Sequence, residues 1–91
     1  MDFIHTREYL GGGDTIVVKV SHKCHVRVMD DANFQNYRNG FSKYTFVGGY
    51  YTQSPIRIVV PQAGNWNIAI DLGGKVAKDI QYGISFLKKR G

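Results

Sequence analysis

The chain has 91 residues, which is enough for one hydrophobic core and too few for two domains. No apolar run approaches the ~20 residues of a membrane-spanning helix, so we expect no membrane partner, and a single cysteine excludes an internal disulfide bond. The net charge of +5 favours an anionic partner over a cationic one.

Alternation of apolar and polar residues dominates the chain and is typical of half-buried β-strands. The clearest strands are predicted at residues 15–21, 25–29, 55–60, 66–72 and 80–86, and weaker ones at 3–10 and 43–47. In the last two clear strands the residues predicted to face inward are Trp66, Ile68, Ile70, Leu72, Ile80, Tyr82, Ile84 and Phe86. Asn67 and Asp71 are expected to face solvent. About seven short, mostly antiparallel strands predict an all-β fold, either a small β-sandwich or a closed barrel.

One segment breaks the alternation and predicts a short helix of about two turns. It reads DDANFQNYRNG at residues 30–40, with an aspartate as N-cap and Gly40 as a C-terminal stop. Phe34 and Tyr37 would share one face of this helix, which we expect to cross one end of the sheets and plug the core. Capping explains the adjacent aspartates better than acid–base catalysis, whose carboxylates come from separate elements.

The stretch SHKCH at residues 21–25 holds three residues of metal-ligating type. If Val20 pairs with Val26, then His22, Lys23 and Cys24 form a hairpin loop. A structural zinc site needs four ligands and the sequence holds no second cluster, so we expect no metal. No catalytic constellation or phosphate-binding glycine loop is present either, and we expect a non-enzymatic protein without a cofactor.

The same pairing would place Lys19 opposite Arg27 on the outer face of one sheet. Like charges in that position are unfavourable unless a carboxylate such as Asp71 or a bound anion neutralises them. The resulting candidate ligand-binding face consists of Lys19, Arg27, Tyr50, Tyr51 and Arg57. Aromatic residues among cations can stack on nucleic-acid bases, but they also simply frame β-sheets.

The domain organisation is predicted to be a single β domain at residues 1–87 and a basic tail at 88–91. The first ten residues lack the basic-then-apolar order of a signal peptide. The lone Cys24 fits a reducing compartment. We therefore expect a cytoplasmic protein.

Two long stretches are specific enough to suggest a family. They read VRVMDDANFQNYRNG, from Val26 to Gly40, and GGYYTQSPIRIVVPQAGNWNIAIDLGG, from Gly48 to Gly74. The chain resembles the bacterial family called domain of unknown function 1883, with patterns such as N-F-x-x-Y, S-P-V-R-L and V-P-x-x-G-x-W. It departs from that pattern at Asn67, where the family has histidine, and in the loop 39–44, which carries one cation where the family has several.

The resemblance implies a small β-sandwich-type domain, either free-standing or preceding a TIR domain, which signals or cleaves NAD. By analogy the chain would be a recognition module that binds a protein partner, such as a TIR-type effector, or an anionic ligand. The alternatives are a nucleic-acid-binding domain, which the two departures disfavour, and a small-molecule sensor in a TIR defence or signalling system.

Overall fold

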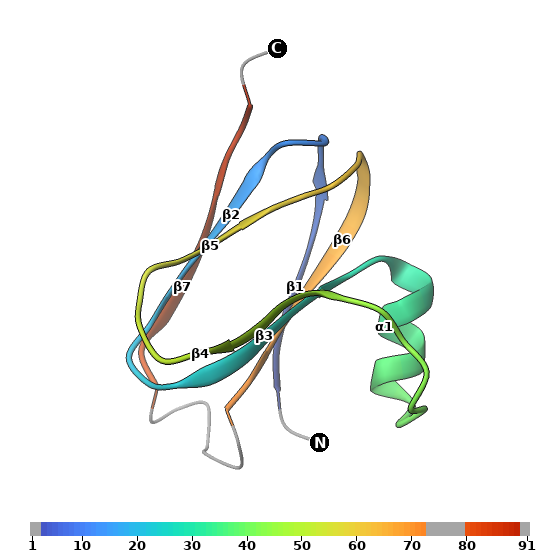
Figure 1. Ribbon diagram of the computed structural model, residues 1–91, viewed down its shortest axis with the longest axis horizontal. Helices are drawn as coiled ribbons and strands as arrows, with labels where there is room; N and C mark the ends of the chain where they lie inside the picture. The colour runs from blue at the N-terminus through green and yellow to red at the C-terminus, as the bar shows by residue number, and fades with distance from the viewer. Residues whose placement is uncertain (1–2, 73–79, 90–91) are drawn as a thin grey trace.

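The computed structural model describes residues 3–72 and 80–89, and Figure 1 shows the course of the chain. Strands and one helix follow each other in the order β1 (Phe3–Leu10), β2 (Thr15–Val20), β3 (Cys24–Met29), α1 (Asp31–Arg38), β4 (Val47–Tyr51), β5 (Ile56–Val59), β6 (Gly64–Asp71) and β7 (Tyr82–Leu87). No helix in these described ranges is long and apolar enough to cross a membrane.

The strands form two antiparallel sheets. Sheet A has the order β1-β6-β3-β4 and sheet B the order β5-β2-β7. The apolar alternation of each strand turns one face of each sheet toward the other, and the shared core includes Val26, Ile68 and Ile70 from sheet A and Ile16 and Val18 from sheet B. The predicted all-β fold is confirmed, and of the two expected forms the structure has the open sandwich and no closed barrel.

Trp66 belongs to this core, as its phase with Ile68 and Ile70 predicted. Its side chain is buried, and the indole Nε1 donates a hydrogen bond to the carbonyl of Gln62 at 3.0 Å. The polar end of the ring is thereby satisfied at the start of β6, and the tryptophan is not available as a stacking platform.

The expected hairpin between residues 15–21 and 25–29 is wrong. β2 lies in sheet B, where Val18 pairs with Ile56 and Ile84, whereas β3 lies in sheet A, where Val26 pairs with Gly49. The segment 21–23 therefore crosses from one sheet to the other. Alternation could not reveal this, because two strands have the same apolar and polar pattern whether they pair in one sheet or face each other across a sandwich.

The helix α1 begins as the sequence predicted. Asp30 is the N-cap, its Oδ1 accepts the backbone N–H of Asn33 at 2.8 Å, and Gly40 follows the helix with a φ of +79°. This carboxylate satisfies one of the free N–H groups of the first turn.

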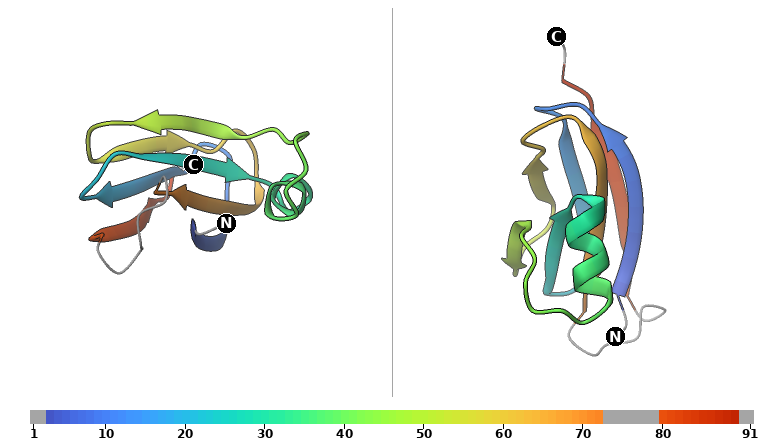
Figure 2. Two further views of the ribbon diagram at one scale, coloured as in Figure 1. Left: turned by 90° about the horizontal axis from the view of Figure 1, so that it is seen from below. Right: turned by 90° about the vertical axis from the view of Figure 1, so that its right-hand side faces the viewer.

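The position of α1 differs from the expectation. Its buried residues Phe34 and Tyr37 pack with Met29 and Ala69, in a cluster separate from the main core. The helix thus covers the outer face of sheet A and does not plug the end of the sandwich; in the right-hand view of Figure 2 it lies in front of the sheet A strands. The described residues thus form three layers, namely α1, sheet A and sheet B, with sheet A in the middle.

The two lysines after β7 are held by the turn between β1 and β2. Asp14 is 5% exposed, and its carboxylate accepts the N–H of Gly11 at 2.8 Å and that of Lys89 at 2.7 Å, with the ammonium of Lys88 at 3.6 Å. These hydrogen bonds lower the pKa of Asp14, and the hydrogen bond from Lys89 has the largest effect. The last two residues of the expected tail, 90–91, lie outside the described residues.

Gly48 in β4 is a position that only glycine fits. Its φ is +128°, and a Cβ built there would collide with the backbone carbonyl of Val26. Its neighbour Gly49 has open space around the corresponding position. The two glycines therefore differ in what they contribute to the pairing of β4 with β3.

We expect Gly48→Ala to lower the free energy of unfolding by about 1–3 kcal/mol, because the new methyl group meets backbone and the φ is unfavourable for alanine. Gly49→Ala is the matched control and should change it by less than about 0.5 kcal/mol. Chemical denaturation of both variants measures the difference. Equal unfolding midpoints would contradict the assignment.

Candidate functional site

The five residues of the predicted ligand-binding face do not lie on one face. Lys19 in β2 and Arg57 in β5 are exposed on the outer face of sheet B. Arg27 in β3 and Tyr50 in β4 belong to the outer face of sheet A, and Tyr51 points inward and packs against the core. The predicted opposition of Lys19 and Arg27 is wrong, because it depended on the pairing of β2 with β3; Lys19 instead pairs with Gly83.

Arg27 is a largely buried cation with a carboxylate beside it. Its side chain is 16% exposed, and Nη1 lies 3.6 Å from Oδ2 of Asp71. The guanidinium carbon lies 5.2 Å from the ring centre of Tyr37 and 5.6 Å from that of Phe46, so two aromatic rings cover the charge. The alternative that Asp71 neutralises this cation is therefore confirmed, and Arg27 is not an open anion site.

Some donors of this buried cluster make no hydrogen bond. Nε and Nη1 of Arg27 and the hydroxyl of Tyr37 are enclosed and have no hydrogen-bond partner among the described residues. Burial is the main reason that the pKa of Tyr37 is raised, with the charge of Arg27 acting in the opposite direction. The cluster therefore holds α1 and the segment before β4 against sheet A mainly through packing and charge.

Asn67 is buried, although it was expected to face solvent. Its Nδ2 donates to Oδ1 of Asp31 at 2.8 Å and to the carbonyl of Met29 at 3.3 Å, and its Oδ1 lies 2.9 Å from Nε2 of His5. The alternation placed Asn67 correctly on the outer face of sheet A. That face is dry at this point because α1 covers it.

Asp31 also receives two hydrogen bonds from Arg7, from Nε at 3.0 Å and from Nη2 at 2.8 Å. The pKa of Asp31 is lowered to about 2. The hydrogen bonds from Arg7 make the largest contribution, and the hydrogen bond from Asn67 makes the next largest. This arrangement ties β1 and β6 to the first turn of α1.

The three residues of metal-ligating type within 21–25 do not point toward a common site. Cys24 is buried in the core, His25 lies on the outer face of sheet A beside Tyr50, and Nδ1 of His22 lies 2.7 Å from Oγ of Ser21. Within residues 3–72 and 80–89, no group of three His, Cys, Asp or Glu side chains is arranged to hold a metal ion.

The outer face of sheet B carries two exposed cations, Lys19 and Arg57. Arg57 pairs with Val17, two residues before Lys19, so the two cations are diagonal neighbours across β5 and β2. The described side chains of this face include no acid; they are Thr15, Val17, Lys19, Arg57, Val59, Ser85 and Leu87. Neither cation has a carboxylate partner within the described part of the chain.

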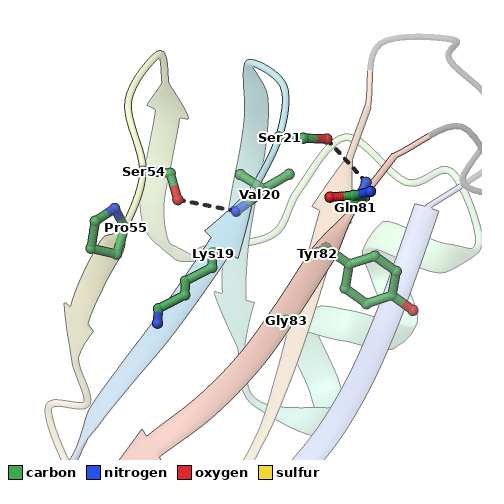
Figure 3. Close-up of a pocket in the computed structure, with 8 residues that line it drawn as sticks. All are labelled: Lys19, Val20, Ser21, Ser54, Pro55, Gln81, Tyr82 and Gly83. Carbon is green, nitrogen blue, oxygen red and sulfur yellow. Dashed lines mark hydrogen bonds between the residues drawn. The ribbon is translucent and has the colours of Figure 1, made fainter.

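A hollow of about 470 Å³ opens around Lys19 at one end of this face. Figure 3 shows Lys19 between Pro55 and Gly83, and the missing side chain of Gly83 leaves room beside the ammonium. The rest of its lining is Val20, Ser21, Ser54, Gln81 and Tyr82. A second hollow of about 510 Å³ shares Val20, Ser21 and Ser54 and adds Lys23 and His22.

Two serine hydroxyls accept backbone hydrogen bonds at this end of the sheet. Ser54 Oγ accepts the N–H of Val20 at 3.1 Å, and Ser21 Oγ accepts the N–H of Gln81 at 3.0 Å. Sequence reasoning missed Ser54, Gln81 and Lys23 as lining residues. No local pattern shows that the segments around residues 20, 54 and 81 meet in space.

The fold and this site define a small two-sheet β-domain with one open cationic face. The chain belongs to the family described as Domain of unknown function (DUF1883), whose family model matches residues 1–85. The suggested resemblance is thereby confirmed. Comparison with curated proteins and with solved structures gives no match.

The pKa of Asp31 tests the buried amide of Asn67. Because this pKa is about 2 in the folded protein and 3.8 is its ordinary value, Asp31 stabilises the fold above about pH 4, and this contribution is lost as the pH falls toward 2. Asn67→Ala should raise the pKa of Asp31 only in part, because Arg7 remains.

NMR titration of the Asp31 carboxyl carbon measures this pKa in the wild type, in Asn67→Ala and in Arg7→Ala. Arg7→Ala should produce the larger rise, since Arg7 supplies the larger effect. Asn67→Ala should also lower the free energy of unfolding by about 1–3 kcal/mol, because it leaves buried polar groups without a partner. A pKa that stays near 2 in both variants would refute the network.

Proposed function

We propose that this chain is a non-enzymatic recognition module, and that the outer face of sheet B binds an anionic group of a protein partner or ligand. The observation that carries the proposal is the pair Lys19 and Arg57. Both are exposed on a face whose described side chains include no carboxylate, beside a hollow of about 470 Å³. Because the described residues give these two cations no carboxylate partner, an incoming anion can pair with them without breaking an ion pair among those residues.

The expected affinity for a simple anion is low. Exposed ion pairs contribute about 0.2–1 kcal/mol each, so two of them give dissociation constants of roughly tens of millimolar or weaker. Tighter binding requires the rest of a partner to bury the apolar side chains of the same face, Val59 and Leu87, which are 58% and 56% exposed. A protein partner with an acidic group fits this combination best.

The site supports binding better than catalysis. Ser21 and His22 are in contact, but they are exposed neighbours in the chain, and the described residues give His22 no carboxylate to orient it. The hydroxyl of Ser54 is engaged by the N–H of Val20. No described group in the hollow forms an activated nucleophile.

The family resemblance suggests the biological setting. It supports a bacterial protein that acts in the cytoplasm, with a TIR-type effector as the partner. Nucleic acid is the weaker alternative. The exposed rings of Tyr50 in β4 and of Phe46 just before it lie near Arg27, which is already paired with Asp71, and at the Lys19 hollow Tyr82 is the one aromatic residue in the described lining. A sensor for a small anionic molecule would use the same hollow at Lys19.

An NMR titration with inorganic pyrophosphate tests the anion site. The amides of β2, β5 and β7 around Lys19 should shift together and saturate, and the response should weaken with added salt. Lys19→Gln and Arg57→Gln should each weaken binding at least about threefold, and the double variant should abolish it.

Arg38→Gln is the control, because it makes the same charge change on α1, away from sheet B. It should leave the titration unchanged. Shifts that are absent, or that follow the lysines after β7, would overturn the anion site. Shifts that a short oligonucleotide produces around Tyr50, with none on sheet B, would favour nucleic acid.

A further inference from the structure

Four described strands lie at the edges of the two sheets, namely β1, β4, β5 and β7. Three of them carry features that oppose the addition of another strand. β5 is four residues long and lies between Pro55 and Pro61, and β4 contains Gly48 with its φ of +128°. β1 carries the exposed Glu8 opposite Trp66, on the side that faces the sandwich interior. Proteins protect sheet edges by such means.

β7 has none of these protective features. Its sequence is YGISFL, without a charge or a proline over six residues. Within the described residues it pairs with β2 alone. An unprotected, uncharged edge of this length is a template for pairing with a further strand.

The register shows which backbone groups of β7 are free. The N–H of Ser21 donates to the carbonyl of Gln81 at 2.9 Å, one pair beyond the partners Val20 and Tyr82. Antiparallel hydrogen bonding recurs at every second pair. The backbone groups of Gly83 and Ser85 therefore face β2, and those of Tyr82, Ile84 and Phe86 face away from it.

The side chains on this edge are also incompletely covered. Ile84 and Phe86 face the core but are only half-buried, whereas Ile16 and Val18 of the neighbouring β2 are fully buried. Tyr82 was predicted to face inward, yet it is 50% exposed. The core is thus open along β7, and a further strand would cover these three side chains.

We propose that a second copy of this chain pairs with β7, antiparallel and centred on Ile84. Two-fold symmetry around this residue places Ile84 opposite Ile84 of the second copy, and Tyr82 opposite Phe86 of the second copy. The outward backbone groups of all three residues then match. The pairing joins the exposed Tyr82 of one copy to the half-buried Phe86 of the other, and such aromatic pairs are favourable across strands.

The antiparallel orientation keeps the like charges of the two copies apart. β7 is followed by Lys88 and Lys89. In antiparallel pairing Lys88 lies opposite the neutral Ile80, and the lysines of the two copies are at opposite ends of the interface. The dimer has a continuous sheet of order β5-β2-β7-β7-β2-β5, so both Lys19 faces belong to one sheet.

The mass of the protein in solution tests this pairing. Sedimentation equilibrium at increasing concentration should show a shift from 10.3 kDa to twice that mass. Ile84→Lys and Ile84→Glu place like charges opposite each other, so each variant should be monomeric on its own. An equimolar mixture of the two variants should recover the doubled mass, because the opposed charges then attract.

Val59→Lys is the control, since it adds the same charge to an exposed position of the other edge strand of sheet B. It should dimerise like the wild type. Hydrogen exchange followed by NMR provides the location: the amides of Tyr82, Ile84 and Phe86 should become protected as concentration rises, whereas those of Gly83 and Ser85 are protected throughout.

Three results would overturn the pairing: a wild-type monomer at millimolar concentration, a dimer that survives in both Ile84 variants, or protection that appears on another strand. If circular dichroism shows that the Ile84 variants do not fold, the exposed position Tyr82 replaces them. Tyr82→Lys should then weaken the dimer at least tenfold, and an unchanged dimer would refute the pairing. Pyrophosphate binding is a separate readout, so either proposal can fail alone.

Discussion

The buried amide of Asn67 is the interaction on which the arrangement of the layers depends. It joins β6 to His5 in β1, to the end of β3 at Met29 and to Asp31 in α1. A buried amide without these partners would cost more than its hydrogen bonds contribute, so the helix has one favourable position, over the outer face of sheet A. Because α1 covers that face, the outer face of sheet B is the sheet surface that no described helix covers.

Most of the described strands, the helix and the inward position of Trp66 could be predicted from local pattern, since alternation and capping depend on residues close in sequence. The strand expected at 43–47 was wrong, because β4 runs over Val47–Tyr51. The connection between β2 and β3 could not be predicted, because a strand that changes sheet keeps the same alternation. Asn67 illustrates a second limit. The alternation placed Asn67 on the correct face of sheet A. It could not show that α1 covers this face and excludes water from it. The grouping of the candidate cations depended on the pairing of β2 with β3, so it was wrong for Arg27, which lies on sheet A, whereas Lys19 and Arg57 share the outer face of sheet B.

Arg27 and Lys19 show how the environment separates two cations that look alike in sequence. Arg27 lies between aromatic rings and beside Asp71, so it contributes to the attachment of α1 and β4 to the sheet. Removing one partner of such a buried pair is costly, because the other charge stays enclosed. Lys19 is solvated and is not part of a buried ion pair among the described residues. Its substitution should therefore affect binding and leave the fold intact. The family match covers both residues, yet only the structure distinguishes their roles.

Because Cys24 is buried, the rate at which its thiol reacts measures how often the sandwich opens. Its thiol is 2% exposed, and burial raises its pKa above the ordinary value, so the reactive thiolate is both hidden and scarce in the folded chain. A disulfide reagent can modify it only in molecules where β3 has separated from the core. The rate of that reaction reports how often the interior opens around β3, without the addition of any foreign label.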